Sequence, residues 1–240
     1  MKPIAIFQHT EVGAPGTVPS ILDALDLPWR VVRVVDGEPV PARADAFSGL
    51  VFLGGSMSVQ DPLAWIAQEI ALIREAASLG VPVCGHCLGS QILASALGGS
   101  VRRNARPEIG WNPITVAETP SAQEWFGEAP GARLLAFQWH GDTFELPPGA
   151  ERIATSAHCE NQAFVMNGRH LAMQSHLEMT PALVELSVAR NGSQLDREFR
   201  AGNPAVTSRE QTLCDLRDRT AAMKSILLRL YSRWAQGLPR

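Results

Sequence analysis

The sequence lacks the features that would place this protein in a membrane or on a nucleic acid. It has no long uncharged apolar run, and its N-terminus has no charged segment followed by an apolar one, as a secretory signal would have. The formal net charge is −3, so basic residues are not in excess over acidic ones. We therefore expect neither a membrane nor a nucleic acid as partner.

Cysteines are few, and the common nucleotide-binding signature is missing. The four cysteines in 240 residues do not form the dense framework of a disulfide-linked secreted domain, which predicts a reducing, cytoplasmic location. No G-x-x-x-x-G-K-[ST] loop is present, so nothing indicates that this chain binds ATP on its own. We expect no cofactor and no metal.

The apolar segments of the first half alternate between strand and helix patterns. We expect strands at 4–8, 31–35, 50–53 and 81–85, and helices at 19–25, 63–79 and 88–97. Strands of continuous Val, Ile and Leu are typical of a parallel sheet that helices cover on both faces. Shorter segments at 109–116, 134–139, 152–156, 163–166 and 170–175 predict further strands, some of them antiparallel. The pattern predicts an α/β fold in a single domain, with a mostly parallel central sheet.

A strand pattern turns abruptly into a helix pattern at Cys87, within the segment VPVCGHCLGSQIL at 81–93. Gly85 and Gly89 lack side chains, so a sharp turn between them can hold Cys87 at its apex in a strained conformation. A helix N-terminus favours a thiolate, and the backbone N–H of Leu88 would face the same space as an oxyanion donor. The segment therefore predicts a nucleophilic cysteine.

A candidate base occurs in the segment HLAMQSHLEM at 170–179. His176 and Glu178 are two residues apart, so on an extended backbone they lie on one side, where the carboxylate can orient the imidazole. Taken alone, such a pair would more often be part of a solvated strand face. With Cys87, however, the pair predicts a triad of nucleophile, general base/acid and orienting group.

The two segments together resemble the class I glutamine amidotransferases, through GHCLGSQ at 85–91 and QSHLE at 174–178. Further landmarks fit that family: LGGSMSVQD at 53–61 resembles its oxyanion-strand loop, LGG at 97–99 and EIGW at 108–111 follow at familiar spacing, and WHGD at 139–142 precedes LPPG at 146–149 as in the guanylate-synthase-like branch. The resemblance implies a flavodoxin-like fold. It also implies a cysteine that the side-chain amide of glutamine acylates, with release of ammonia and hydrolysis of the γ-glutamyl thioester.

The resemblance also implies roles for several other residues. Backbone N–H groups around Gly54 and Gly55 would complete an oxyanion hole with Leu88. Gln91 would contact the glutamine substrate, with a helix-surface amide as the alternative, and backbone groups of Gly141 and Asp142 would hold the same ligand. His140 is assigned to loop structure or to proximity to the substrate, because the family places its base in the later His-x-Glu.

Two positions depart from the usual family pattern. The commonest form has an apolar residue before the cysteine and a proline between the histidine and the glutamate, where this chain has His86 and Leu177. A leucine at position 177 leaves the side chains of His176 and Glu178 in place but removes the backbone restraint of a proline. His86 should point to the strand face opposite Cys87, which favours a structural role over a proton carrier or substrate contact. Cys84 lies inside the strand pattern, so its C-x-x-C with Cys87 is not typical of a redox pair or zinc site.

The C-terminal fifty residues predict a polar connection and one long helix. The helix should bury a stripe of residues that recur at steps of three and four: Leu213, Leu216, Thr220, Met223, Leu227, Leu230 and Trp234. We divide the chain into an amidotransferase-like catalytic domain at 1–190 and an extension at 191–240, in which 191–204 is a loop or flexible connection and the helix packs on the same domain. A dimer or partner interface on that helix is the alternative.

Three functions remain open. The first is a glutaminase that acts on L-glutamine and delivers ammonia to an acceptor enzyme; the stretch after Glu178 is too short for a synthetase domain, so we expect any synthetase to be a separate chain. The second is a stand-alone hydrolase of a γ-glutamyl amide. The third is a non-catalytic binding or regulatory module, which would be expected to have lost a member of the triad.

Overall fold

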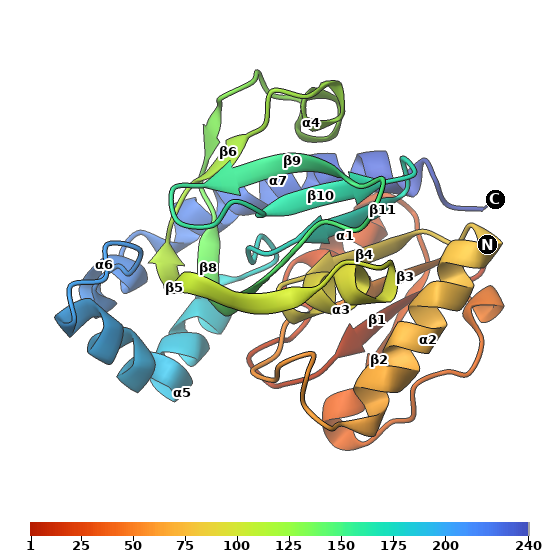
Figure 1. Ribbon diagram of the computed structural model, residues 1–240, viewed down its shortest axis with the longest axis horizontal. Coiled ribbons are helices and arrows are strands. Elements are labelled where there is room, and N and C mark those ends of the chain that lie inside the picture. The colour runs from red at the N-terminus through yellow and green to blue at the C-terminus, as the bar shows by residue number, and fades with distance from the viewer. Residues whose placement is uncertain (240) are drawn as a thin grey trace.

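A nine-stranded mixed sheet forms the centre of the protein in a computed structural model that describes residues 1–239 (Figure 1). Its strand order is β2-β1-β3-β4-β11-β10-β9-β6-β7. The parallel half comprises β2 (Trp29–Arg33), β1 (Ile4–Gln8), β3 (Gly49–Phe52), β4 (Val83–His86) and β11 (His170–Met173). The antiparallel half comprises β10 (Ala163–Met166), β9 (Glu151–Ser156), β6 (Ile114–Val116) and β7 (Arg133–Leu134). The predicted α/β class with a mostly parallel sheet is confirmed for the half that carries the candidate site.

Helices cover both faces of this sheet. The helices are α1 (Val18–Ala24), α2 (Ala64–Leu79), α3 (Leu88–Ala96), α4 (Pro120–Phe126), α5 (Pro181–Arg200), α6 (Arg209–Leu213) and α7 (Leu216–Ala235), with short 3₁₀ turns at Val34–Asp36 and Ala44–Ala46. Along β1, Ile4 and Ile6 join a core that contains residues of α1, α4 and α7, whereas Ala5 and Phe7 join a core with residues of α2 and α3. This alternation places one apolar layer on each face of the sheet.

A two-stranded ribbon lies outside the main sheet. Strands β5 (Val101–Trp111) and β8 (Phe137–Phe144) pair antiparallel, and β6 resumes in the main sheet only three residues after β5 ends. The prediction of a single strand at 109–116 is therefore wrong, because this segment is divided between β5 and β6. Pro113, which lacks a backbone N–H, lies at the break.

The C-terminal region differs from the prediction in two places. Residues 191–200 are not a loop but the second half of α5, which Thr180 caps by accepting a hydrogen bond from the Leu183 N–H and which buries Val188 and Leu195 on one side. The 190/191 boundary thus falls inside a helix. The long C-terminal helix begins at Leu216, and Leu213 belongs to the short α6 and is 38% exposed.

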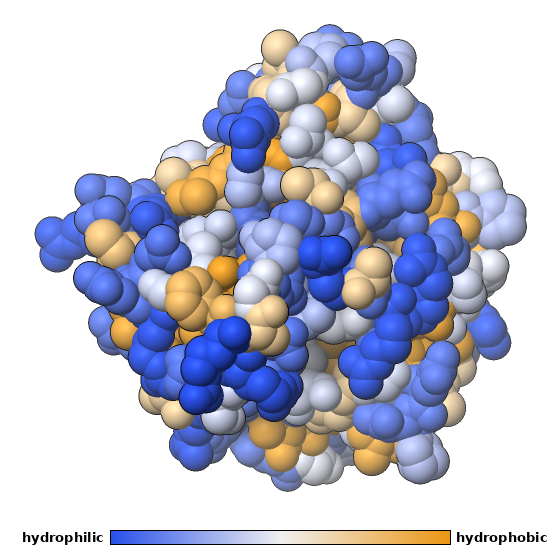
Figure 2. All heavy atoms as spheres, turned by 60° about the vertical axis from the view of Figure 1, so that its left-hand side comes forward, coloured by the Kyte–Doolittle hydropathy of each residue, from blue (hydrophilic) through white to orange (hydrophobic). Residues whose placement is uncertain are grey.

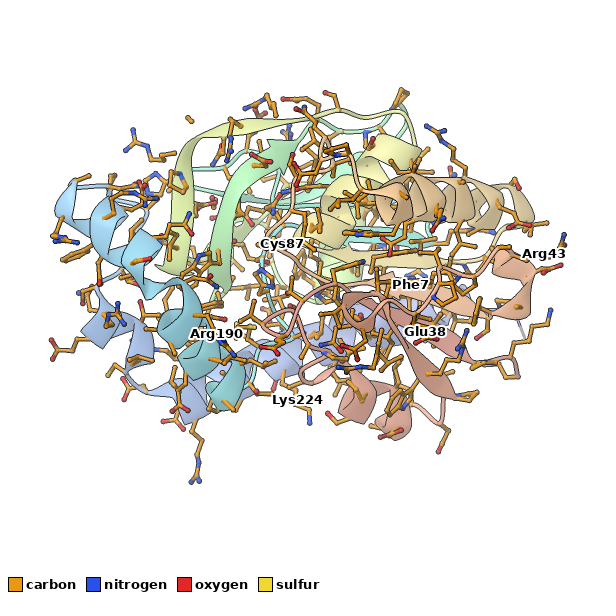
Figure 3. All side chains as sticks on the ribbon, turned by 90° about the horizontal axis from the view of Figure 1, so that it is seen from below. Phe7, Glu38, Arg43, Cys87, Arg190 and Lys224 are labelled. Carbon is orange, nitrogen blue, oxygen red and sulfur yellow. The ribbon has the colours of Figure 1, made fainter. Side chains whose placement is uncertain are left out.

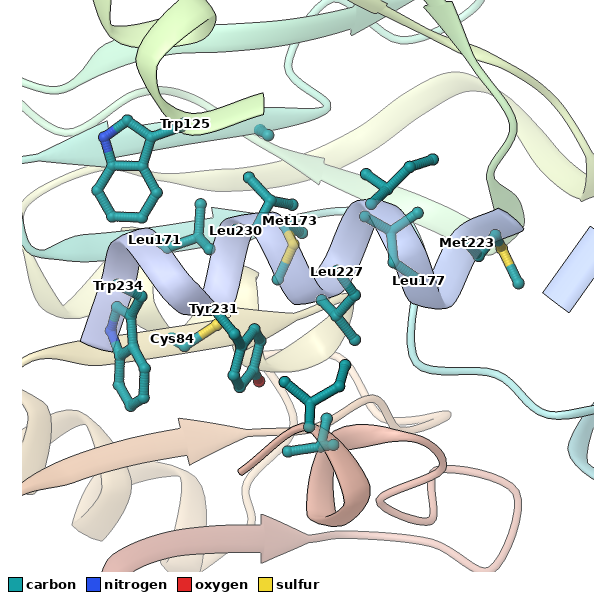
Figure 4. Packing of buried hydrophobic residues seen from close by; sticks show 14 of the residues in the cluster. Cys84, Trp125, Leu171, Met173, Leu177, Met223, Leu227, Leu230, Tyr231 and Trp234 are labelled. Carbon is teal, nitrogen blue, oxygen red and sulfur yellow. The ribbon is translucent and has the colours of Figure 1, made fainter. Parts of the chain in front are cut away.

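Helix α7 packs against the sheet with a broad apolar face (Figure 4). Its buried residues include the predicted Met223, Leu227, Leu230 and Trp234, and also Tyr231, which the expected stripe did not contain. In residues 1–239, no helix is both long and apolar enough to cross a membrane.

Candidate active site

Cys87 occupies the sharp turn between β4 and α3, near the centre of the molecule (Figure 3). Its backbone has φ 49° and ψ −109°, a conformation that costs an L-residue about 1–3 kcal/mol. A Cβ atom on Gly85 would lie 2.5 Å from the Gly89 carbonyl oxygen, and one on Gly89 would clash with the Phe52 carbonyl oxygen. Both flanking glycines are therefore needed for the close approach of β3, β4 and α3 that holds Cys87 in place.

His176 and Glu178 follow the end of β11 and form a buried pair. His176 Nδ1 lies 2.7 Å from Glu178 Oε1, and the Glu178 side chain is 1% exposed. Two backbone hydrogen bonds fix this segment: the His176 N–H donates to the Phe137 carbonyl and the Thr17 N–H donates to the Glu178 carbonyl, each over 2.8 Å. These bonds tie the backbone on both sides of Leu177 to neighbouring segments.

Each member of the pair favours the charged form of the other. Burial opposes the protonation of His176, but the Glu178 carboxylate and then the Cys87 sulfur outweigh burial and hold the pKa of His176 well above its ordinary range. Burial also opposes the ionisation of Glu178, but His176 and then His86 outweigh it and hold the pKa of that carboxyl well below its ordinary range. The geometry thus suits an imidazolium beside a cysteine thiolate.

Cys87 and His176 open into the same pocket, which has a volume of about 230 Å³. The pocket is bounded by the loop after β1, the loop after β3, strand β8 and helix α5. The residues that line it include Val12, Gly54, Gly55, Gln91, Trp139, Gly141, Asp142, Ser187, Asn191 and Gln194. The predicted nucleophile, base and substrate-binding positions therefore meet in one cavity, although α5 was not expected to contribute to it.

The loop after β3 approaches the triad closely at Gly54 and Gly55. A Cβ on Gly54 would lie 2.6 Å from His176 Cε1, and one on Gly55 would lie 2.8 Å from Leu88 Cδ2. Leu88 is the first residue of α3, so its backbone N–H has no acceptor within the helix. The three positions predicted for an oxyanion hole lie around Cys87.

Two buried residues that the sequence analysis did not identify support this loop. His9 Nδ1 lies 3.1 Å from the Leu53 carbonyl oxygen, and His9 Nε2 lies 2.9 Å from Glu69 Oε1. The His9 ring also stacks on Trp65 at 4.9 Å between ring centroids. The pair joins residues 60 positions apart in the chain, so no local pattern could have indicated it.

Replacing Gly54 by alanine should lower kcat/KM at least about 100-fold, because the added methyl displaces either the imidazole of His176 or the backbone that faces the substrate. The stability of the fold should change little by comparison. Steady-state kinetics and thermal unfolding measure the two effects. Gly237→Ala is the control, since a Cβ there meets its nearest atom at an ordinary 3.4 Å; equal activity of the two variants would contradict the assigned role of Gly54.

Gln91 is buried and points inward. Its side chain is one turn along α3 from Cys87, and its Nε2 donates over 3.2 Å both to the Asp142 carbonyl and to Gln174 Oε1. The alternative of a helix-surface amide is therefore wrong. Gln174, which the sequence analysis left unassigned, places its Nε2 at 3.6 Å from Cys87 Sγ. The side chain of Asp142 forms an ion pair with the exposed Arg103, whose Nη1 lies 3.2 Å from Asp142 Oδ1.

His140 belongs to a second buried polar group, separate from the candidate triad. His140 Nε2 lies 3.0 Å from Glu108 Oε2, and His140 Nδ1 lies 2.9 Å from the Asp142 carbonyl oxygen. Ligand atoms of Glu108, His140 and Cys159 lie within 4.8 Å of one another, as in a metal site. However, burial raises the pKa of the Cys159 thiol to about 11, and Gln162 and Ser156 already donate to Glu108. We assign this group to support of the pocket wall.

His86 points away from the pocket, as expected from its place beside Cys87, but it does more than fill space. Its Nδ1 lies 2.9 Å from Glu178 Oε2, on the oxygen that His176 does not use. His86 is fully buried. It is thus a second partner of the candidate triad carboxylate.

Comparison with known proteins shows which family this chain resembles. The family model for "Glutamine amidotransferase class-I" matches residues 22–193. The crystal structure of a glutamine amidotransferase from Methylobacillus flagellatus superposes with a TM-score of 0.95 at 38% identity, over 100% of this chain and 96% of that one. One from Thermotoga maritima has a TM-score of 0.82 at 28% identity, over 98% of each chain.

Curated relatives carry three kinds of name. The putative glutamine amidotransferase-like protein YfeJ of Salmonella typhimurium is 32% identical over 68% of this chain and 70% of its own length. Gamma-glutamyl peptidase 4 of Arabidopsis thaliana is 32% identical over 62% of this chain and 61% of its own length. A subunit of the glutamine-hydrolysing GMP synthase of Saccharolobus solfataricus is 31% identical over 55% of this chain and 68% of its own length. The chain belongs to the class I glutamine amidotransferase family.

Proposed function

We propose that this protein hydrolyses the side-chain amide of glutamine, or of a glutamine-like γ-glutamyl compound, through a thioester on Cys87. The observation that carries the proposal is the strained Cys87 at the start of α3, in one pocket with a histidine that is paired to a buried glutamate. Family membership and the presence of all three triad residues argue against a non-catalytic module.

The proposed reaction begins with attack of the Cys87 thiolate on the γ-carbonyl carbon. Negative charge on the carbonyl oxygen is stabilised by backbone N–H groups of Leu88 and of the Gly54–Gly55 loop. The C–N bond then breaks, and His176 donates a proton to the departing ammonia or amine. In the second half, His176 takes a proton from water, the hydroxide attacks the thioester carbonyl, and glutamate leaves as the C–S bond breaks. Glu178 holds the imidazole in the orientation that both halves require.

Two substrate classes share this chemistry, and they differ in the group that leaves the γ-carbonyl carbon. A glutaminase releases ammonia, whereas a γ-glutamyl hydrolase releases a larger amine. The second class is favoured by the similarity to a protein named gamma-glutamyl peptidase. The first is favoured by similarity to a protein named as part of a glutamine-hydrolysing GMP synthase and to two solved glutamine amidotransferases.

If the protein is a glutaminase, we propose that a separate acceptor chain uses the ammonia. The support is that the GMP synthase relative from Saccharolobus solfataricus is by name one subunit of an enzyme. On the face shown in Figure 2, apolar residues are interspersed with polar ones. We also propose a cytoplasmic location, for which the support is that all four cysteines are unpaired.

The test compares L-glutamine with a γ-glutamyl dipeptide as substrates of the purified protein, with glutamate, ammonia and free amino acid measured. We expect release of glutamate from at least one of them. Ammonia from glutamine with little cleavage of the dipeptide would support the glutaminase, and the reverse would support the hydrolase. If neither compound is turned over and neither protects Cys87 from alkylation, the protein is not an amidohydrolase of this class.

A further inference from the structure

His86 is connected to the triad and to the C-terminal helix by hydrogen bonds at both ring nitrogens. Its Nδ1 lies 2.9 Å from Glu178 Oε2, and its Nε2 lies 2.9 Å from the hydroxyl of Tyr231 on α7. The His86 and Tyr231 ring centroids are 6.0 Å apart. A chain of contacts thus runs from His176 through Glu178 and His86 to Tyr231, and Figure 4 shows Tyr231 extending from α7 toward Cys84, two residues before His86.

The carboxylate of Glu178 depends on these two histidines for its charge partners. In residues 1–239, its ion pairs are those with His176 and His86, and its side chain is 1% exposed. A thiolate, an imidazolium and a carboxylate would together leave one net negative charge in this buried site. Such a charge is costly unless it is paired, and a positive charge on His86 makes the group of four neutral.

The surroundings of His86 suit a cation. The groups in contact with it are Glu178 after β11, Cys84 on its own strand and Tyr231 on α7. His176 lies beyond Glu178, on the other oxygen of that carboxylate. Burial opposes the charge, but Glu178 foremost, with Cys84, outweighs it and raises the pKa of His86 to about 10. Burial is the largest cause that raises the pKa of Tyr231, so its hydroxyl stays protonated.

We propose that His86 is a positioning residue which stays cationic throughout the working pH range, pairs with the free oxygen of Glu178 and so sets the pH window in which Cys87 and His176 act as a thiolate–imidazolium pair. The proposal rests on the proposed amidohydrolase function. It gives α7 a part in the site, because Tyr231 supplies the partner of His86 Nε2.

Removal of the His86 charge should move the whole pH profile rather than only lower it. Without that positive charge the Cys87 thiolate is less stable, so the acid limb of the kcat/KM profile, where the thiolate is protonated, moves to higher pH. The charge of Glu178 then acts on His176 alone, so the alkaline limb, where the imidazolium loses its proton, also moves to higher pH. Acting across the Glu178 carboxylate inside a protein, a unit charge should shift both midpoints by about one pH unit. At a fixed pH on the acid limb, kcat/KM should then fall about tenfold.

The experiment compares His86→Asn, His86→Leu and Tyr231→Phe with the wild-type chain over the full pH profile of kcat/KM. Asparagine keeps a neutral N–H donor for Glu178, whereas leucine removes both donor and charge. We expect the maximum kcat/KM of the Asn variant to be close to that of the wild type and higher than that of the Leu variant. Both variants should show the shift of the pH profile. Tyr231→Phe should shift the profile in the same direction by less than about half a pH unit.

A second readout does not require turnover. In a Cys214→Ala background, the rate of Cys87 alkylation by iodoacetamide is followed against pH, and the midpoint should rise in the His86 variants by the same amount. His170→Asn is the control: His170 is also buried, but burial lowers its pKa to about 4, so it carries no charge to lose. Profiles of His86→Asn and Tyr231→Phe that superimpose on wild type in both limbs would overturn the proposal. If no amide is turned over but alkylation shifts as stated, the proposed function fails and the role of His86 stands.

Discussion

Replacement of Cys87 by alanine should lower the turnover of glutamine or a γ-glutamyl amide more than about 10⁴-fold, because no other group can form the thioester. The fold should keep its stability within about 1 kcal/mol, since alanine has the same steric difficulty at φ 49° as cysteine and the side chain lost is small. Rates of glutamate release and thermal unfolding, measured on the same preparation, separate the two effects.

Cys214→Ala is the matched control for this variant. Cys214 is an exposed thiol between α6 and α7, so its removal tests whether any accessible cysteine supports the reaction. It should leave turnover unchanged. Full activity in Cys87→Ala, or loss of activity in Cys214→Ala, would mean that the nucleophile is wrongly assigned.

Replacement of His176 by alanine should lower kcat about 10³-fold or more, because acylation loses both the partner of the thiolate and the donor of a proton to the leaving group. KM should change less, since the walls of the pocket remain. The rate of the variant should be measured at increasing concentrations of free imidazole. Partial recovery of the rate would show that the missing function is proton transfer. A variant with a normal kcat and a raised KM would instead make His176 a binding residue.

Glu178→Gln should be milder, with a loss of about 10- to 100-fold. The two oxygens of Glu178 each accept from a histidine Nδ1, one from His176 and one from His86. A glutamine has one oxygen and one amide nitrogen, so only one of the two histidines keeps an acceptor. Glu178→Ala, which removes both acceptors, should be the more damaging substitution in the same assay.

The sequence predicts the part of the site that depends on neighbouring residues. Gly85 and Gly89 indicated the turn at Cys87, and in the structure a Cβ atom at either position would clash with a neighbouring backbone. Likewise, the paired spacing of His176 and Glu178 brings their side chains together, although β11 ends at Met173 and the pair lies just beyond it. Strand β1 was predicted to the residue, whereas the bounds of β3 and β4, which are equally buried, differ from the prediction by one or two residues.

The parts that escaped prediction are contacts between distant segments. His86 and Tyr231 are 145 positions apart, and Glu108 reaches Gln162 across 54. Only the packing of α7 on β4 brings the first pair together, and no local spacing encodes that packing. Residues 191–200 were misread because their polar composition hid a helix whose few apolar residues recur on one face.

The proposed thioester on Cys87 can be observed directly by mass spectrometry of the protein quenched in acid during turnover of glutamine or the γ-glutamyl dipeptide. We expect a γ-glutamyl adduct on the peptide that contains Cys87, which disappears when substrate is exhausted and never forms in Cys87→Ala. Turnover without an adduct on Cys87, or with an adduct on another residue, would contradict the proposed thioester.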